Sequence, residues 1–253
     1  MEPSRTSQIV ALIRAELVRP STPLGDPNAQ RELCSGMRPS RTARPWPDIA
    51  ARTRFFDEQV LMAIAAGINQ IVICGAGYDD RALRFRSSGV RFFELDQPTT
   101  QADKARRLRK MDASTDDLVL IPADFRHDDA PKLLRDSGHS AGRPTLFVCE
   151  GLLVYLDKRA VSRFLGGLRS VASPSSTLTA SLACRREGED SDQVLAIANA
   201  RRLTGRREPW LTILSANEYL GLFSKAGWDV DYTSKASGDS SRLLLVTARP
   251  RSP

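Results

Sequence analysis

Apolar and polar positions along the chain follow two different periods. Short apolar runs such as QIVIC are typical of buried strands, and longer stretches with apolar residues three and four apart are typical of helices. The predicted strands are Gln70–Cys74, Arg91–Asp96, Leu118–Ile121, Thr145–Glu150, Ser176–Ala183, Trp228–Thr233 and Leu243–Ala248. The predicted helices are Ser7–Val18, Pro47–Ala66, Asp79–Arg86, Thr99–Met111, Asp129–Ser137, Asp157–Val171, Asp192–Leu203 and Ala216–Ala226.

This alternation predicts an α/β fold with a doubly wound, mostly parallel sheet of seven strands and helices on both faces. The last two strands flank the turn sequence SKASGDSS and are expected to form an antiparallel hairpin at one side of the sheet. We expect one domain over residues 1–253, with a helical extension and basic lid at 1–46 and an α/β core at 47–253.

The densest group of basic residues lies in MRPSRTARPWPDIAARTR, where arginines alternate with prolines from Arg38 to Arg54. Two interpretations remain open. The segment is either a solvated linker stiffened by proline, or a mobile cationic segment that closes over an anionic substrate.

Composition narrows the class of protein. The 253 residues are 41% hydrophobic and 26% charged, which is ordinary for a globular protein with a substantial core. The chain shows neither a signal peptide nor a membrane-spanning apolar run, so a cytoplasmic location is expected. Its four cysteines lack metal-site spacing, and its two histidines, His127 and His139, have no metal-ligand partner nearby, so no metal is expected.

Chemically distinctive residues follow the ends of four predicted strands. Gly75-Ala76-Gly77 follows the first strand, Glu94 and Asp96 close the second, Asp124 follows the third, and Glu150 ends the fourth. In a parallel sheet these ends meet at one edge, where ligands bind at the point of strand reversal. The pattern therefore predicts a nucleoside-binding cleft.

The residues after the glycine turn indicate which nucleoside. A dinucleotide fingerprint needs a third small residue where this chain has Asp80, and Asp79 precedes it. A helix N-terminus normally attracts a pyrophosphate, but two carboxylates there would repel it. No phosphate loop of the GKS or GKT type is present. A cofactor with a cationic amino acid, a sulfonium and no phosphate fits better, which indicates S-adenosyl-L-methionine.

Several motifs, taken in order, resemble one family. The run ARTRFFDEQV, IVICGAGYDDRALRF, RFFELDQP, KARRL, IPADFRHDD and PTLFVCEGLLVYL is similar to the leucine carboxyl methyltransferase family, and within it to the bacterial branch linked to O-methylation of polyketides and other secondary metabolites. The LGDPNA turn and the EPW sequence at Glu208 to Trp210 are also similar. The resemblance implies a Rossmann-like, class I methyltransferase fold.

The resemblance implies a role for each matched position. The glycine loop would approach the methionine part of S-adenosylmethionine, Arg52 would pair with its carboxylate, and Asp96 would accept the ribose hydroxyls. The implied cofactor-binding residues are Arg52, Gly75, Ala76, Gly77, Asp96, Gln97, Asp124, Phe125 and Glu150. Asp124 and Phe125 would hold the adenine, and Glu150 would lie near the methionine amino group or the sulfonium.

Alternatives stand beside these roles. Strand alternation is expected to turn one of Glu94 and Asp96 away from the ribose. The resemblance favours Asp96 for the ribose, which leaves Glu94 facing away in a structural role. Arg54 is the alternative to Arg52. Asp79 is expected to cap the short helix after the glycine turn. The predicted catalytic residues are Glu150, Tyr155 and Arg81. Arg81 could equally pair with a carboxylate at the sheet end, and Tyr155 could equally belong to the core.

The scarcity of histidine favours one reaction. A hydroxyl acceptor usually needs a base in the pocket, whereas a carboxylate is already ionised at neutral pH. We therefore expect an O-methyltransferase that esterifies a carboxylate of a small anionic metabolite. The alternatives are methylation of a polyketide-type hydroxyl or phenol, an RNA methyltransferase or RNA-binding protein suggested by the net charge of +7, and a catalytically idle binding partner. Neither nucleic acid nor membrane is an expected partner, and a homodimer is compatible with the sequence.

Overall fold

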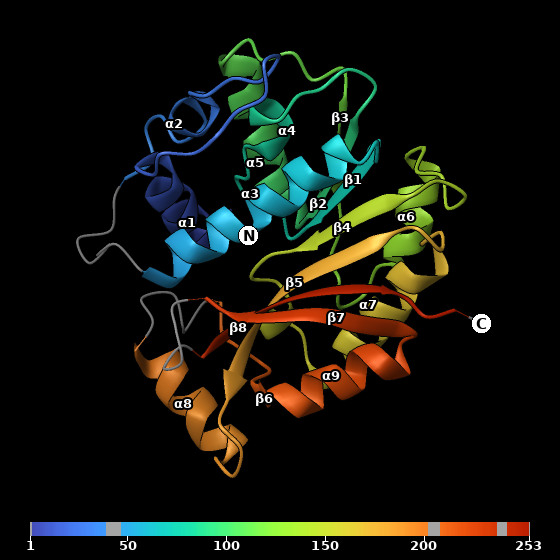
Figure 1. Cartoon of the computed structure of the whole chain (residues 1–253). Coiled ribbons are helices and arrows are strands. Elements are labelled where there is room, and N and C mark those ends of the chain that lie inside the picture. Colours follow the sequence, from blue (N-terminus) through green and yellow to red (C-terminus); the bar gives the residue numbers. More distant parts are fainter. Residues whose placement is uncertain (1, 39–46, 202–207, 237–241, 253) are drawn as a thin grey trace.

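A mixed sheet forms the centre of the molecule, with helices on both faces (Figure 1). The computed structural model describes residues 2–38, 47–201, 208–236 and 242–252. The strands are β1 (Gln70–Cys74), β2 (Arg91–Asp96), β3 (Leu118–Pro122), β4 (Thr145–Cys149), β5 (Thr177–Arg185), β6 (Leu214–Ser215), β7 (Trp228–Lys235) and β8 (Leu243–Pro250). The helices are α1 (Arg5–Ala15), α2 (Ala29–Leu33), α3 (Pro47–Ala65), α4 (Arg81–Arg84), α5 (Pro98–Lys110), α6 (Ala130–Asp136), the short 3₁₀ helix η1 (Leu153–Tyr155), α7 (Lys158–Ser170), α8 (Ser191–Arg201) and α9 (Ala216–Lys225).

Strand order places the reversal of the sheet at β1. The order is β3-β2-β1-β4-β5-β8-β7, and the short β6 pairs with β5 outside this path. Strands β1 to β5 run parallel to one another, whereas β8 runs antiparallel to both of its neighbours, β5 and β7. The chain moves outward from β1 to β2 and β3, then crosses back to β4 on the other side. The carboxyl ends of β2, β1 and β4 therefore meet where nucleotide-type ligands bind in open α/β sheets.

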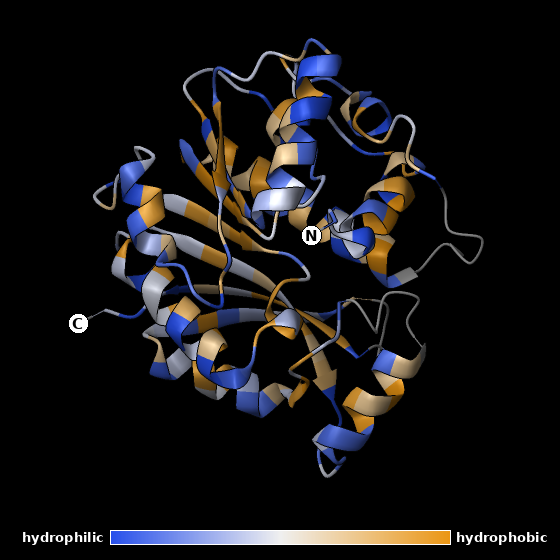
Figure 2. Ribbon diagram, turned by 180° about the vertical axis from the view of Figure 1, so that it is seen from behind, coloured by the Kyte–Doolittle hydropathy of each residue, from blue (hydrophilic) through white to orange (hydrophobic). Residues whose placement is uncertain are grey.

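Each face of the sheet has its own apolar core, because side chains alternate along a strand. From β1, Val72 and Cys74 belong to the core under α6, α7 and α9, whereas Ile71 and Ile73 belong to the core under α3 and α4. Figure 2 shows the central strands as mostly hydrophobic and the outward helix surfaces as mixed or hydrophilic. Strands buried on both faces explain why the sequence shows continuous apolar runs there.

The buried indole of Trp228 ties the final hairpin to this core. Its Nε1 donates a 2.9 Å hydrogen bond to the carbonyl of Leu165 on α7, and its ring packs edge-on against Phe147 of β4. Within the hairpin, the last strand, β8, lies next to β5, and β7 forms the edge. The predicted antiparallel hairpin is therefore confirmed, and its inner strand is β8.

The predicted fold class is confirmed, including the mostly parallel sheet. Strands β1 and β2 have the predicted bounds, and the other long elements begin and end within a few residues of theirs. Three short elements were not predicted: α2, η1 and β6. Residues 39–46 of the expected basic lid lie outside the described residues, as do the end of the predicted helix Asp192–Leu203 and most of the SKASGDSS turn. In the described part of the chain, no helix has the length and hydrophobicity that a membrane span requires.

Candidate active site

The four predicted strand-end positions meet at one edge of the sheet. The backbone N–H groups of Gly75 and Ala76 donate to the carbonyl of Leu95 at distances of 2.8 and 3.1 Å, which ties the glycine loop to the end of β2. The N–H of Ala123, past β3, donates to the carbonyl of Asp96 at 2.8 Å. Loops after β1, β2 and β3 are thus held directly against one another.

The glycine loop requires glycine for both conformation and space. Gly75 and Gly77 have φ angles of 71° and 53°, a region that other residues rarely adopt. A Cβ at Gly75 would lie 3.2 Å from the side chain of Leu152, and one at Gly77 would lie 2.6 Å from Cβ of Ser7 on α1. The space above Gly77 is therefore occupied by α1.

Asp96 is positioned to receive hydrogen bonds at the mouth of this loop. Its Oδ2 accepts the N–H of Gly77 at 2.6 Å, and its Oδ1 accepts the N–H of Gln97 at 2.6 Å. Burial raises the pKa of Asp96 to about 6 despite these two bonds. Gln97 is exposed at the N-cap position of α5.

Glu94 has a structural role, as expected, but the expectation that it faces away from Asp96 was wrong. Phe93 and Leu95 of β2 belong to the core under α7, so Glu94 and Asp96, which alternate with them, share the opposite face. Glu94 is fully buried and pairs with Lys104 of α5. Burial raises the pKa of Glu94 to about 7. Glu94 and Asp96 point to the same face of the sheet, but Glu94 lies two residues before the end of β2 and Asp96 lies at the end itself. This difference in position gives them different roles.

The predicted adenine position lies past β3. Asp124 is partly exposed and forms an ion pair with Arg126 at 2.7 Å, and this hydrogen bonding lowers its pKa. Phe125 is buried with its ring edge-on against Phe164. Arg126 donates two hydrogen bonds to Oδ1 of Asp124 and one to Oδ2, so an acceptor site remains on Oδ2 for an adenine amino group.

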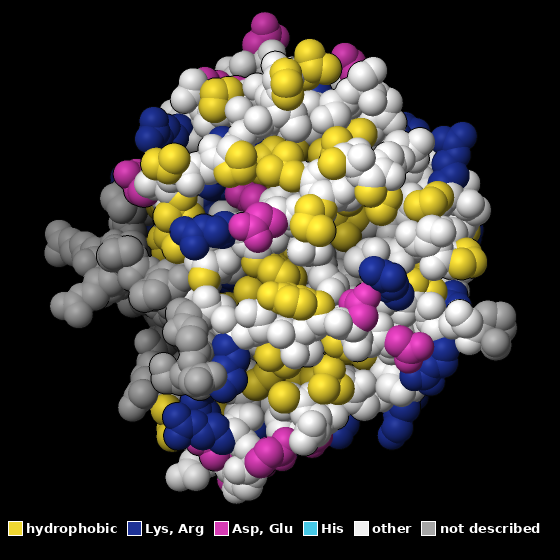
Figure 3. All heavy atoms as spheres, viewed as in Figure 1, with side chains coloured by type: hydrophobic (Ala, Val, Ile, Leu, Met, Phe, Trp, Pro, Cys, Tyr) yellow, Lys and Arg dark blue, Asp and Glu magenta, His cyan; other side chains and the backbone are white. Residues whose placement is uncertain are grey.

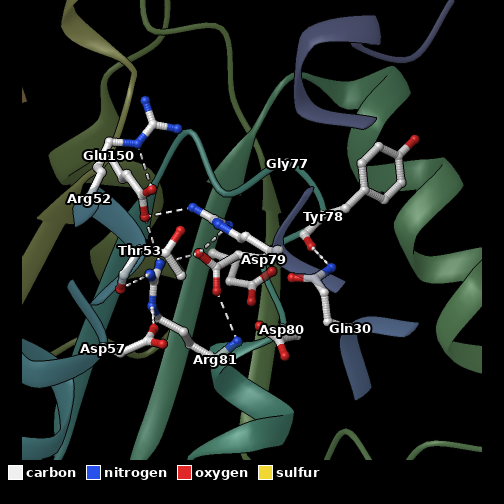
Figure 4. Close-up of polar contacts among 12 residues, drawn as sticks. Gln30, Arg52, Thr53, Asp57, Gly77, Tyr78, Asp79, Asp80, Arg81 and Glu150 are labelled. Carbon is white, nitrogen blue, oxygen red and sulfur yellow. Dashed lines mark hydrogen bonds and ion pairs between the residues drawn. The ribbon is translucent and has the colours of Figure 1, made fainter. Parts of the chain in front are cut away.

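Glu150 lies at the centre of a buried cluster of charges, shown in Figure 4. Its Oε1 accepts from Nε of Arg52 at 2.8 Å, and its Oε2 accepts from Arg14 at 2.6 Å and from Arg81 at 2.8 Å. These arginines hold the pKa of Glu150 well below its usual value in spite of burial. The following residue, Gly151, donates its N–H to Oγ of Ser181 at 2.8 Å and so fixes the turn. A carboxylate with three guanidinium partners is a poor base, which argues against that role for Glu150.

Arg81 is not an acceptor anchor in this structure, contrary to its predicted catalytic role. Its side chain is fully buried, and its guanidinium donates to Asp57, Asp79, Glu150 and the carbonyl of Thr53. The alternative, pairing with carboxylates at the sheet end, is what the structure shows. Asp79 also accepts the N–H of Arg81 at 2.8 Å, in the manner of a capping side chain, although Asp80 occupies the N-cap position of α4.

The cluster extends to residues that the sequence did not identify. Arg19 joins Asp57 at 2.7 Å to Asp80 at 2.6 Å. Among the described residues, the members of the cluster are Arg14, Arg19, Arg52, Arg81 and Arg84 with Asp57, Asp79, Asp80 and Glu150. One positive charge is in excess. The only sequence signal for Arg14 was its place within the apolar segment IVALIRAEL.

Arg52 is the arginine of the cluster whose terminal nitrogens remain available to a ligand. Its Nε is bound to Glu150, and no hydrogen bond from its two terminal nitrogens to any described residue is present. In Figure 4 these nitrogens point away from the rest of the cluster. Gly151 leaves them room, because a Cβ there would lie 3.3 Å from one of them. Arg54 is exposed on α3 outside the cluster, so the geometry favours Arg52 over Arg54 as a binder of a carboxylate.

Tyr155 and the histidines complete the set of predicted groups. Tyr155 is half-buried in η1, next to Val154, whose carbonyl accepts the N–H of Leu211 at 2.8 Å. His127 is exposed. His139 is buried at the opposite edge of the sheet, bonded to Thr145 at the start of β4, and burial lowers its pKa to about 4. Within the described residues there is no cluster of metal-ligating side chains.

Comparisons with known proteins agree with this architecture. Two solved structures have the same fold: a methyltransferase, provisionally so named, from Thermobifida fusca (TM-score 0.63, 14% identity, covering 99% of this chain and 96% of that one) and a DUF574 family protein from Streptomyces avermitilis (TM-score 0.61, 15% identity, 98% of each chain). At these identities the likeness concerns the fold alone.

Sequence relatives are closer but longer. A Mycolicibacterium gilvum protein with the provisional name S-adenosyl-L-methionine-dependent methyltransferase is 32% identical over 212 residues, which is 78% of this chain and 66% of its own length. A similarly named Mycolicibacterium smegmatis protein is 40% identical over 132 residues, 51% of this chain and 44% of its own. The chain thus spans between 44% and 66% of the length of these two relatives. The model of the leucine carboxyl methyltransferase family matches residues 7–169, which is more than half of the chain, and the protein therefore belongs to that family.

Proposed function

We propose that this protein transfers the methyl group of S-adenosyl-L-methionine to a carboxylate oxygen of a small metabolite. Bound S-adenosyl-L-methionine would supply the methyl group as an electrophile and keep the electron pair of the broken carbon–sulfur bond, while a carboxylate oxygen of the acceptor would supply the pair for the new bond. The products are a methyl ester and S-adenosylhomocysteine. No proton leaves the acceptor, because a carboxylate is already ionised at neutral pH.

The residues at the cleft fit such a cofactor, which supplies an electrophilic methyl group when bound. Arg52 presents two terminal nitrogens to a carboxylate, the bidentate geometry in which arginine binds carboxylates best. Asp96 offers carboxylate oxygens for ribose hydroxyls at the end of β2. Glu150, with its oxygens held by arginines, orients Arg52 through Nε and does not bind the methionine amino group itself.

The observation that carries the choice of a carboxylate acceptor is the state of Glu150. The Glu150 carboxylate lies beside Arg52 and would be the group to remove a proton from a hydroxyl acceptor. Its three guanidinium partners lower its pKa, which makes it a weak base. Neither histidine lies beside Glu150 and Arg52: His139 is buried at the amino ends of the strands, and His127 is exposed in the loop past β3, next to the predicted adenine position. An acceptor that needs no deprotonation is therefore the best match.

The net charge of the chain gives little support to a nucleic-acid partner. The side chains of Arg14, Arg19, Arg81 and Arg84 are at most 6% exposed and neutralise buried carboxylates. On the face drawn in Figure 3, the lysines and arginines are scattered and form no continuous basic patch. We therefore propose a small anionic acceptor.

The role of Arg52 can be tested by substitution. Arg52→Ala should weaken S-adenosylhomocysteine binding at least tenfold, because each charged hydrogen bond contributes about 1.5–3 kcal/mol. Arg52→Lys keeps the positive charge but loses the paired terminal nitrogens of the guanidinium, so its affinity should lie between those of the wild type and Arg52→Ala. The matched control is Arg54→Ala, two residues away and exposed, which should bind like the wild type in titration calorimetry. Equal losses at both positions would remove Arg52 from the cofactor site.

The pH dependence of binding should report Asp96. Ribose hydroxyls donate to the ionised carboxylate, so binding becomes weaker as Asp96 takes up a proton. Affinity for S-adenosylhomocysteine should be constant above about pH 7 and fall towards tenfold per pH unit below about pH 6, the pKa of Asp96. Asp96→Asn should bind weakly and lack this slope. If Asp96→Asn keeps the full pH dependence of binding, another group titrates. Glu94, whose pKa is about 7, is then the first candidate.

The reaction itself can be read from its product. The protein is incubated with methyl-labelled S-adenosylmethionine and a small-molecule extract, and the labelled product is treated with mild alkali. We expect the label to be released as methanol, because esters hydrolyse and methyl ethers do not. An alkali-stable product would make the reaction a hydroxyl methylation with Tyr155 as the base to test. Label in added RNA would support the RNA methyltransferase instead.

A further inference from the structure

Helix α1 is held differently at its two ends. Its C-terminal end is buried through Ala11, Arg14 and Ala15, and Arg14 forms ion pairs with Asp79 and Glu150. By contrast, every residue from 4 to 10 is only half-buried. A segment with buried ion pairs at one end and partly exposed contacts at the other opens most readily at the second end.

The first turn of α1 depends on a carboxylate from a distant part of the chain. The N–H groups of Arg5 and Thr6 donate to Oε1 and Oε2 of Glu208 at 2.7 and 2.9 Å. The next N–H, of Ser7, is capped by Oγ of Ser4 at 3.1 Å. Glu208 therefore satisfies two of the N–H groups that a helix leaves unpaired at its start, and its charge is favourable there.

The same turn lies directly over the candidate cofactor loop. Ser7 occupies the space above Gly77, and the N–H of Gly77 donates to Asp96, the candidate ribose acceptor. Burial is the main cause of the raised pKa of Asp96, and Glu208 adds to it, which places that carboxylate within electrostatic reach. Any ligand that contacts the backbone of Gly77 must therefore pass under this turn or displace it.

The segment that carries Glu208 also reaches the acceptor side of the cleft. Beyond Trp210, the N–H of Leu211 and the hydroxyl of Thr212 donate to the carbonyls of Val154 and Leu156 at 2.8 and 2.6 Å. These residues flank Tyr155. One segment thus joins the turn beside the candidate acceptor pocket to the first turn of α1.

We propose that residues 5–10 of α1 form a hinged cover over the glycine loop, with Glu208 as the latch that holds it closed. The cover pivots at Ala11 to Arg14, where the buried ion pairs fix the helix. Lifting it exposes Gly77 and lets the cofactor product leave. Insofar as the ligand is S-adenosylhomocysteine, the proposal rests on the function proposed above.

Two measurements on Glu208→Gln and Glu208→Ala test the latch. The first is the rate at which S-adenosylhomocysteine leaves the full-length protein, followed by tryptophan fluorescence after mixing with a competitor. We expect about a tenfold faster release in Glu208→Ala, in line with the loss of two charged hydrogen bonds, and a smaller increase in Glu208→Gln. The matched control is Glu187→Gln, an exposed glutamate bonded to Asn217, which should release at the wild-type rate.

The second measurement is hydrogen exchange in the protein without ligand, which does not depend on the identity of the cofactor. The amides of residues 5–10 should lose protection in both Glu208 variants, while those of 11–15 and of β1 keep it. Unchanged release and exchange in the variants, or loss of protection along the whole of α1, would overturn the hinged cover. If the wild type fails to bind S-adenosylhomocysteine, the proposed function falls, and the exchange pattern alone decides for or against the latch.

Discussion

Buried charge is the constraint on which this structure depends. The side chains of Asp57, Asp79, Asp80 and Glu150 are at most 3% exposed, and an isolated carboxylate in such a position would be very costly. Each is held by two or more arginines, and those arginines come from the N-terminal segment, α3 and α4. Removing one partner from a buried pair of this kind costs about 3–5 kcal/mol, because the remaining charge is left uncompensated. The cluster therefore fixes the positions of the helices that surround the cleft.

This arrangement also divides the roles of residues that look alike in the sequence. Arg81 and Arg52 both reach Glu150, but Arg81 uses every branch of its guanidinium within the cluster. Arg52 uses Nε alone and directs its remaining nitrogens outward. Glu150 therefore acts as the group that orients Arg52, although its position in the sequence suggests a base. The chemistry left at the cleft favours binding and positioning of an ionised acceptor over removal of a proton.

Local pattern was enough to predict most of the fold and the edge of the sheet where the site lies. Strands β1 and β2 agree with prediction because both are buried on two faces and end in distinctive residues. By contrast, α2, η1 and β6 are two to five residues long and take their conformation from what they pack against. The network of ion pairs could not be predicted, since the partners of Glu150, at Arg14, Arg52 and Arg81, lie 69 to 136 residues away along the chain. The contact of Glu208 with Arg5 spans 203 positions and has no local signal at all.

A crystal structure with bound S-adenosylhomocysteine tests the central claim most directly. The account predicts that the two terminal nitrogens of Arg52 bind the carboxylate of the homocysteine part, while Glu150 keeps its bonds to Arg14, Arg52 and Arg81. It also predicts the ribose hydroxyls on Asp96. A complex in which Glu150 leaves the arginines to bind the amino group, with Arg52 turned away from the ligand, would contradict it.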